Sequence, residues 1–300
     1  MSPSSAVSDF AAGDKAAQPQ EPFRLGSPQH LTAFCRMLLD THNPYKPAVM
    51  DWPKLEKDAR DRLVALPIWD IAVQTEGRAR LHVATYGNGI ADPLLKKAVE
   101  MNAFEEGRHK HVLSNLVRAY GIELKPEPEY IVPKDPEWSF MVTGYSECID
   151  SFFAFGLFDA AKQTGFFPEE LVETFEPVIQ EEARHILFFV NWVAWHRRTM
   201  PWWRRPYFEL KVLRVWLFLI WERIGIARDV GHGVQDNNFT MTGAKQVGAD
   251  IEVSDLMRIC LSENDRRMAR LDARLPRPST VPALARFALR FMGKPKKAAS

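Results

Sequence analysis

The 300-residue sequence predicts an all-α fold, a four-helix bundle with extra C-terminal helices. Three observations support this class. Apolar residues recur at helical spacing over long stretches, strand-like alternation is scarce, and proline and glycine interrupt the middle of the chain only at long intervals. Because 46% of the residues are hydrophobic, the chain can bury a sizeable core.

Proline and glycine also mark where the predicted helices start and stop. Pro93 stands at the first position of the second core helix, Gly121 follows its last residue, and four prolines make residues 125–136 a linker. The core helices are predicted, in chain order, at about 67–86, 92–120, 137–163 and 168–198. Further helices are predicted at about 206–228 and 253–274, with a polar loop at 231–243 between them and a short basic helix from Pro282.

We expect four regions along the chain. Residues 1–27 are rich in Ser, Ala, Pro and Gln, a composition typical of a disordered arm. Residues 28–200 form the bundle, with its core helices from about residue 66. Residues 201–280 add helices that pack on the bundle or on a membrane surface, and residues 281–300 form a basic tail.

Several features bear on location and partners. The N-terminus has no charged start followed by an apolar core, so it does not resemble a secretory signal. Cys35, Cys148 and Cys260 are isolated, which fits a reducing compartment. No run reaches the roughly 20 apolar residues of a spanning helix. With a net charge of +1, no nucleic-acid partner is expected. We therefore expect a cytoplasmic protein, with peripheral contact to the inner membrane surface left open.

Two short motifs carry the functional argument. Glu106 and His109 form a Glu-x-x-His unit in the second core helix, and Glu182 and His185 form the same unit in the fourth. At a spacing of three residues, the two side chains of each unit share one helix face. That face is the apolar one, because steps of three and four lead mostly to apolar positions: Leu95, Val99, Asn102, Leu113 and Leu116 in one helix, and Leu171, Phe175, Val178, Phe189 and Trp192 in the other.

The other two core helices carry similar intrusions. Glu76 interrupts the apolar stripe of the first helix, and Glu147 interrupts that of the third. Buried ionisable groups are unfavourable unless they are paired or bound to metal. Four glutamates and two histidines from four helices are the ligand set of carboxylate-bridged di-iron bundles. A solvated helix face explains one motif alone, but it does not explain both motifs together with both partner glutamates.

This pattern resembles the ferritin-like superfamily. The spacings look like those of demethoxyubiquinone hydroxylases and rubrerythrins, and the doubled acidic-Glu-x-Arg-His form is similar to the acyl-carrier-protein desaturases. The resemblance covers about residues 66–198. It implies that Glu106 and Glu182 bridge two metals, that Glu76 and Glu147 are terminal ligands, and that His109 and His185 each bind one metal.

The resemblance also implies a supporting set of charged residues. The outer nitrogen of a ligating histidine usually donates to a carboxylate. Glu105 and Glu181 are the candidates, each serving the histidine of the opposite motif. Arg108 and Arg184 would then balance their charge.

Residues one turn from Glu147 are candidates for catalysis beside it. Thr143 and Ser151 offer hydroxyls that could relay protons, although such residues more often only pack. Asp150 could support the centre or contribute in place of Glu147. We predict Glu147, Thr143 and Ser151 as catalytic residues and Asp150 as a supporting one.

These residues and the resemblance imply an oxygen-dependent oxidoreductase, a di-iron monooxygenase or oxidase. It would hydroxylate, desaturate or otherwise oxidise an apolar or lipid-like organic substrate. The expected cofactors are two iron ions, with Mn/Fe as the other option, and dioxygen is the co-substrate. An electron donor, a reductase or a ferredoxin, would be needed, and a homodimer is an option. The alternative is a ferroxidase or iron-storage protein without an organic substrate.

Two regions suggest contact with a membrane surface. The helix at 207–226 interleaves aromatic residues such as Trp216 and Trp221 with arginines such as Arg214. The segment 281–297 holds five basic residues and no acidic one. Aromatic and basic residues together suit a bilayer interface. A helix that covers the bundle, followed by a solvated basic tail, is an equally open interpretation.

Overall fold

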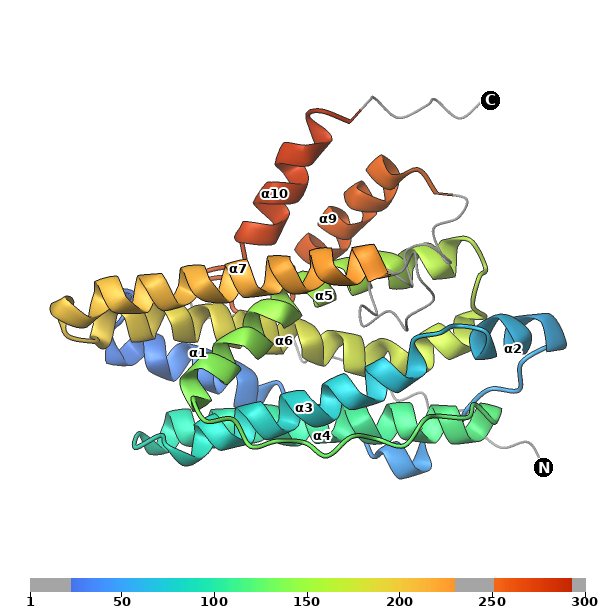
Figure 1. Cartoon of the computed structure of the whole chain (residues 1–300), viewed down its shortest axis with the longest axis horizontal. Helices are drawn as coiled ribbons and strands as arrows, with labels where there is room; N and C mark the ends of the chain where they lie inside the picture. The colour runs from blue at the N-terminus through green and yellow to red at the C-terminus, as the bar shows by residue number, and fades with distance from the viewer. Residues whose placement is uncertain (1–22, 230–250, 293–300) are drawn as a thin grey trace, which may run out of the picture.

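The computed structural model describes residues 23–229 and 251–292, the side chains of 225–229 excepted (Figure 1). Within these ranges all regular secondary structure is helical, as predicted. The helices are α1 (Pro28–Asp40), α2 (Lys57–Val64), α3 (Trp69–Asn88), α4 (Pro93–Tyr120), α5 (Pro136–Gln163), α6 (Glu169–Thr199), α7 (Arg205–Asp229), α9 (Val253–Ala269) and α10 (Thr280–Leu289), with short 3-10 turns η1 (Pro47–Val49) and η2 (Trp202–Arg204).

Two antiparallel hairpins, α3–α4 and α5–α6, form the bundle (Figure 1). The crossover at 121–135 runs back along the α3–α4 hairpin to the end of the bundle where α5 begins. Gly77 of α3 allows this close passage, because a Cβ there would lie 2.5 Å from the hydroxyl oxygen of Tyr130. The crossover makes α5 run parallel to α4, so the second hairpin starts at the end of the bundle where the first hairpin turns; there Tyr86 of α3 stacks on Phe140 of α5.

Local signals set the ends of the core helices. The carboxylate of Asp92 accepts the backbone N–H groups of Leu94 and Leu95 at 3.0 and 2.8 Å, which caps α4. Gly121 ends the same helix in the left-handed region, at φ 67°. The four predicted core helices are confirmed, each end lying within two residues of the observed one.

Helix α1 belongs to the core, although the sequence analysis does not predict it. It packs against α4 and α6, and its Phe34, Cys35 and Leu38 are fully buried. The buried His30 anchors it, since its Nε2 lies 2.9 Å from Oδ1 of Asn191 on α6. At 13 residues α1 is too short to show the extended apolar period that identified the bundle helices.

The C-terminal helices cover the α5 side of the bundle. Helices α7, α9 and α10 all contact α5. Gly156 lets α9 lie directly on α5, because a Cβ there would sit 2.7 Å from the Cα of Cys260. Helix α9 ends at Ala269, five residues before the predicted end. Beyond it the chain forms a turn in which the Asp272 carboxylate accepts the backbone N–H of Arg274.

Some predictions fall outside the described residues. These are the arm at 1–22, the polar loop at 231–243 and the last basic residues, from Lys294 onward. Among the residues that the structure does describe, none of the helices combines the length and the apolar character needed to cross a membrane.

Candidate metal centre

The two Glu-x-x-His units meet in the middle of the bundle. Glu106 and His109 of α4 and Glu182 and His185 of α6 each place one ligand atom within 4.8 Å of the others. The two imidazole rings are 5.5 Å apart between centroids. Both histidines are buried. The fold therefore gathers two imidazoles and two carboxylates around one enclosed point.

One nitrogen of each histidine faces this point. His109 Nδ1 lies 3.1 Å from Glu182 Oε1 and 3.6 Å from Glu76 Oε2. His185 Nδ1 lies 2.9 Å from Glu106 Oε1. Although these oxygens are near, neither Nδ1 makes a hydrogen bond of acceptable geometry, and both atoms are enclosed. Buried nitrogens without a hydrogen-bond partner are rare, and here they have the positions that metal ligands would take.

The opposite nitrogen of each histidine is held by the other motif. His109 Nε2 lies 2.9 Å from Glu181 Oε2, and His185 Nε2 lies 2.8 Å from Glu105 Oε2. Glu105 is on α4 with His109, and Glu181 is on α6 with His185. Each carboxylate thus fixes the ring of the histidine across the bundle, which leaves both Nδ1 atoms aimed inward.

A buried arginine holds each of these two carboxylates. Arg108 donates from Nη2 to Glu181, and Arg184 donates from Nη1 to both oxygens of Glu105, at 2.9 and 3.0 Å. The arginine side chains are only 5% and 2% exposed. Burial alone raises the pKa of Glu105, but the hydrogen bond to His185 and the charge of Arg184 outweigh burial. The pKa of Glu105 is therefore well below its usual range, and Glu105 is an anion.

Residues from outside the bundle complete this charged layer, and the sequence analysis missed them. His42 Nδ1 lies 2.6 Å from Glu105 Oε1, and the Tyr45 hydroxyl donates to Glu181 Oε2 at 3.2 Å. Arg184 Nε donates to the Thr41 hydroxyl at 2.8 Å, and Arg108 Nη1 donates to backbone oxygens of Asn43 and Tyr45. Only the polar and aromatic character of the segment 41–45 signals this role, since it has no helical period.

The remaining predicted ligands, Glu147 and Glu76, lie beside the same point. Glu147 Oε1 is buried without a hydrogen-bond partner. Burial, together with the negative charges of Glu106 and Glu182, raises the pKa of Glu147 well above its usual range. Burial likewise raises the pKa of Glu76 to about 8, although the nearby His109 opposes the shift. Such crowding of carboxylates is unfavourable unless cations share the space.

The balance of charge matches two divalent ions. Six carboxylates converge on the two histidines, and two arginines neutralise part of their charge; with neutral imidazoles, four negative charges are left over. Two divalent cations would neutralise that remainder and would take up the partnerless nitrogens and oxygen. Glu76, Glu106, Glu147 and Glu182 would lie around them, while Glu105 and Glu181 hold the outer nitrogens of the two histidines.

The carboxylates around the two histidines favour positive charge at this point. Burial alone would lower the pKa of both His109 and His185, but the surrounding carboxylates outweigh burial and raise each pKa well above its usual value. The strongest opposing influence is the hydrogen bond to Glu181 for His109, and the charge of Glu106 for His185. The site therefore attracts positive charge.

The predicted hydroxyl groups have specific partners. Ser151 donates to Glu182 Oε2 at 3.2 Å. The Thr143 hydroxyl lies 3.0 Å from Nδ1 of His82, a partly buried residue of α3. Asn102 also enters this layer, as its amide donates to Glu106 Oε1 at 3.1 Å.

Asp150 lies elsewhere than predicted. Its carboxylate pairs with Arg223 of α7 at 2.8 Å and accepts from Ser146 at 2.9 Å. It is 36% exposed, at the contact between α5 and α7. The basic residue on α7 draws Asp150 away from the carboxylate cluster, so the structure does not support its predicted place beside the ligands.

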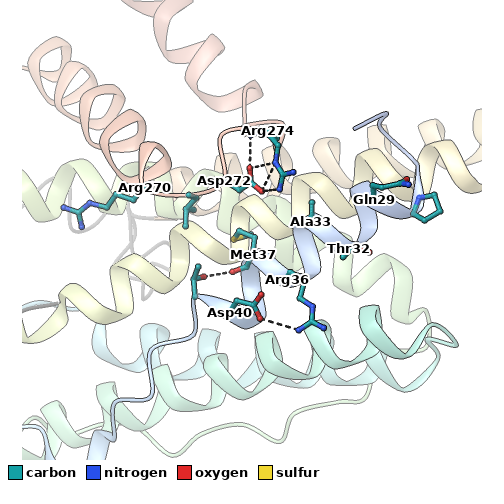
Figure 2. A pocket seen from close by; sticks show the side chains of 12 residues that line it. Gln29, Thr32, Ala33, Arg36, Met37, Asp40, Arg270, Asp272 and Arg274 are labelled. Atoms are coloured by element: carbon teal, nitrogen blue, oxygen red, sulfur yellow. Dashed lines mark hydrogen bonds and ion pairs between the residues drawn. The ribbon is translucent and has the colours of Figure 1, made fainter. Parts of the chain in front are cut away.

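A separate pocket of about 630 Å³ lies between α1 and the segment that follows α9 (Figure 2). Four of its charged residues are paired locally: Arg36 with Asp40 at 3.6 Å, and Arg274 with Asp272 at 2.6 Å. The residues that line it include none of the predicted ligands. This pocket is therefore not part of the candidate centre.

Comparison with solved structures identifies the fold as ferritin-like. An R2-like ligand-binding oxidase with an aerobically reconstituted Mn/Fe cofactor matches with a TM-score of 0.50 at 16% identity, over 82% of this chain and 93% of that one. A mutant with the same cofactor gives 0.52 at 15% identity, over 83% and 99%. Another mutant, with an Fe/Fe cofactor, gives 0.50 at 16% identity, over 82% and 94%.

Two sequence comparisons gave no match. No protein-family model matches the chain, and no curated protein does. At the identities of the structural matches the likeness establishes the fold alone, so function must be argued from the residues of this chain.

Proposed function

We propose that this protein is an oxygen-dependent oxidoreductase of the monooxygenase or oxidase type, with a two-metal centre in its ferritin-like bundle. The metals would be Fe/Fe or Mn/Fe. Similar solved structures carry cofactors of these two kinds, which supports the choice. The proposed ligands are Glu76, Glu106, His109, Glu147, Glu182 and His185.

One observation carries the proposal. The Nδ1 atoms of His109 and His185 are enclosed, lack hydrogen-bond partners and face carboxylates of both motifs. A purely structural pair of histidines would use these nitrogens in hydrogen bonds. Bound metals would supply open coordination positions and electrons for the reduction of dioxygen.

The chain itself orients the ligands. Glu105 and Glu181 accept the Nε2–H of opposite histidines, which selects the tautomer whose Nδ1 lone pair points inward. Arg108 and Arg184 hold these two carboxylates in place by hydrogen bonds. The ligand geometry is thereby set before any metal binds, as a site for demanding chemistry requires.

Hydroxyl groups beside the centre can hold protons. Ser151 holds its proton on Glu182 Oε2, and Thr143 is hydrogen-bonded to His82 Nδ1. Burial is the main reason that the pKa of His82 is lowered, so His82 is a neutral partner for Thr143. We propose that these hydroxyls deliver protons to the reacting oxygen atoms, next to Glu147.

The proposed substrate is an apolar or lipid-like organic molecule. Tyr145, Cys148 and Phe189 belong to one apolar cluster. Tyr145 and Cys148 lie within two residues of Glu147 on α5, and Phe189 of α6 is in ring contact with Tyr145. Gly144 brings α5 close to Phe189, because a Cβ there would lie 2.2 Å from the phenyl ring. A substrate held on this side of Glu147 would meet hydrocarbon rather than water.

Metal content and oxygen uptake test the proposal together. After reconstitution with ferrous iron, or with manganese and iron, we expect about two metal ions per chain. Reduced, loaded protein should consume dioxygen. His109→Ala and His185→Ala should each lose metal and oxygen uptake, whereas His111→Ala, at an exposed position of the same α4, should retain both.

Two outcomes would contradict this assignment. Normal metal loading and oxygen uptake in His109→Ala or His185→Ala would show that the ligands are wrong. Iron oxidation with no organic oxidation, in an assembly that elutes as a very large cage, would favour the ferroxidase alternative instead.

A further inference from the structure

Helix α7 has one face in the core and one in solvent. Phe208, Val215 and Leu219 point into the protein and are buried. The opposite side is exposed from Tyr207 to Ile224, yet it is mainly apolar. We call it the outer face of α7; it consists of Tyr207, Leu210, Leu213, Leu217, Trp221 and Ile224.

The outer face is unusual for a helix on the surface of a protein in water. Such helices normally place charged and polar residues on the solvent side, and large exposed apolar patches mark contact surfaces. Here Trp221 is 70% exposed. At the N-terminal end Trp202, 79% exposed, and Trp203 precede the helix. The patch is therefore continuous in sequence from η2 to the last described side chains of α7.

The charged residues around the outer face are mainly basic. Arg204, Arg205 and Arg214 are exposed beside it. Glu209 is the exposed acidic residue of this part of α7, and it is neutralised by Arg197 at 2.5 Å. The surface thus combines exposed indole and aliphatic groups with an excess of positive charge.

Helix α10 repeats this composition. Leu284 and Phe287 are exposed on one face of α10, and Phe291, which follows the end of the helix, is also exposed. Arg286 and Arg290 are exposed next to them. The same pairing of apolar and basic side chains therefore occurs on two separate helices.

We propose that the outer face of α7 docks onto the surface of a lipid bilayer that contains anionic lipids. Tryptophan and tyrosine rings favour the headgroup level, aliphatic side chains reach the acyl boundary, and arginines pair with lipid phosphates. No described helix can cross a membrane, so α7 lies along the interface. This inference does not depend on the proposed function.

The charge pattern favours a bilayer over a second copy of this chain. A twofold contact through the outer face of α7 would pair this surface with itself, so the excess positive charge of both copies would enter one interface. An anionic bilayer instead offers opposite charge along the whole helix. Docking would also bring lipid close to α5, since Trp216 and Tyr145 are in ring contact at 5.0 Å.

Vesicle flotation of the full chain tests the proposal. We expect the protein to float with vesicles of phosphatidylcholine and phosphatidylglycerol, and much less with phosphatidylcholine alone. Leu217→Glu with Trp221→Glu should reduce the partition coefficient roughly tenfold or more, because two charges enter the apolar contact. Arg204→Glu with Arg205→Glu should reduce binding to the anionic vesicles by a similar factor.

A matched control carries the same change at another exposed apolar site. Ile131→Glu with Val132→Glu, on the crossover, should float as the unmodified chain does, since these positions are 83% and 61% exposed away from α7. Circular dichroism should show that every variant is folded. Equal flotation of all variants, or none by the unmodified chain, would overturn the proposal. So would a dimer in sedimentation that Leu217→Glu dissociates and that does not bind vesicles.

Discussion

The two hairpins of the bundle hold the centre almost symmetrically, but their outer contacts differ. In each half a Glu-x-x-His unit is preceded by a glutamate that serves the opposite histidine, and an arginine holds that glutamate. Beyond this layer, the Glu105 carboxylate is hydrogen-bonded to His42, whereas the Glu181 carboxylate accepts a hydrogen bond from Tyr45. The bundle is twofold in its ligands and asymmetric in what surrounds them.

This asymmetry comes from a single segment of the chain. The segment 41–45 follows α1, lies outside the bundle and touches both halves at once. One segment cannot present the same residue to two related positions, so it breaks the symmetry that the helices share. The two glutamates therefore orient a histidine in the same way but have different neighbours. Substitutions can separate the effect of the shared contacts from the effect of those neighbours.

The largest effect is expected where the halves are alike. Glu105→Ala and Glu181→Ala each leave a buried arginine without its main carboxylate, which typically lowers the free energy of unfolding by about 3–5 kcal/mol. Denaturant unfolding of the metal-free protein measures the loss. Glu100→Ala, at an exposed position of α4, should change little. Losses that differ by more than about 2 kcal/mol would break the symmetry argument.

A smaller effect should reveal where the halves differ. His42→Phe removes a 2.6 Å contact to an ionised carboxylate, which is typically worth about 1.5–3 kcal/mol. Tyr45→Phe removes a 3.2 Å hydrogen bond but keeps the ring 4.0 Å from the Arg108 guanidinium. We expect the second change to lower stability by about 1 kcal/mol. If Tyr45→Phe proves the more harmful in denaturant unfolding, the roles of the two neighbours are reversed.

The smallest effect concerns the outer cover of each half. Glu137 of α5 binds His196 of α6 and Lys211 of α7 at 2.9 and 2.7 Å. The hydrogen bond from His196 is the main reason that the pKa of Glu137 falls to about 2, from an ordinary value of 4.5. Because the folded pKa is the lower one, the stabilisation is present above pH 4.5 and is lost as the pH falls toward 2.

Glu137→Gln should therefore lower the free energy of unfolding by about 1 kcal/mol at neutral pH, and the difference should vanish in acid. Glu127→Gln is the counterpart on the other half, where Glu127 of the crossover binds Lys110 of α4 at the surface. Its effect should stay within about 0.5 kcal/mol. Urea titrations at several pH values compare the two variants. An equal loss of unfolding free energy in both would contradict the expectation that the Glu137 contacts to α6 and α7 stabilise the protein more than the surface contact of Glu127.

Much of the bundle could be predicted from the sequence because its signals are local. Apolar residues at steps of three and four, with capping residues and glycines at the ends, determine α3 to α6. The same spacing places Glu106 with His109, and Glu182 with His185, on the buried faces. Their meeting at one point follows once four such faces form one core.

The contacts around the ligands could not be predicted, since they join distant parts of the chain. His42 and Glu105 are 63 residues apart, and Tyr45 and Glu181 are 136 residues apart. Asp150 shows the converse. Its spacing from Glu147 suggests the buried face, but the position of Arg223 on α7 decides where its side chain lies. Tertiary partners of this kind leave no local period.

The crossed pairing of glutamates and histidines has a consequence for how the protein folds. Each histidine finds its carboxylate 72 or 80 residues away, on the other hairpin. Neither hairpin can build half of the centre by itself, because the contacts that orient the ligands join the two hairpins. Metal loading should therefore be a late event in folding, so a newly made chain would take up its ions only after both hairpins have docked.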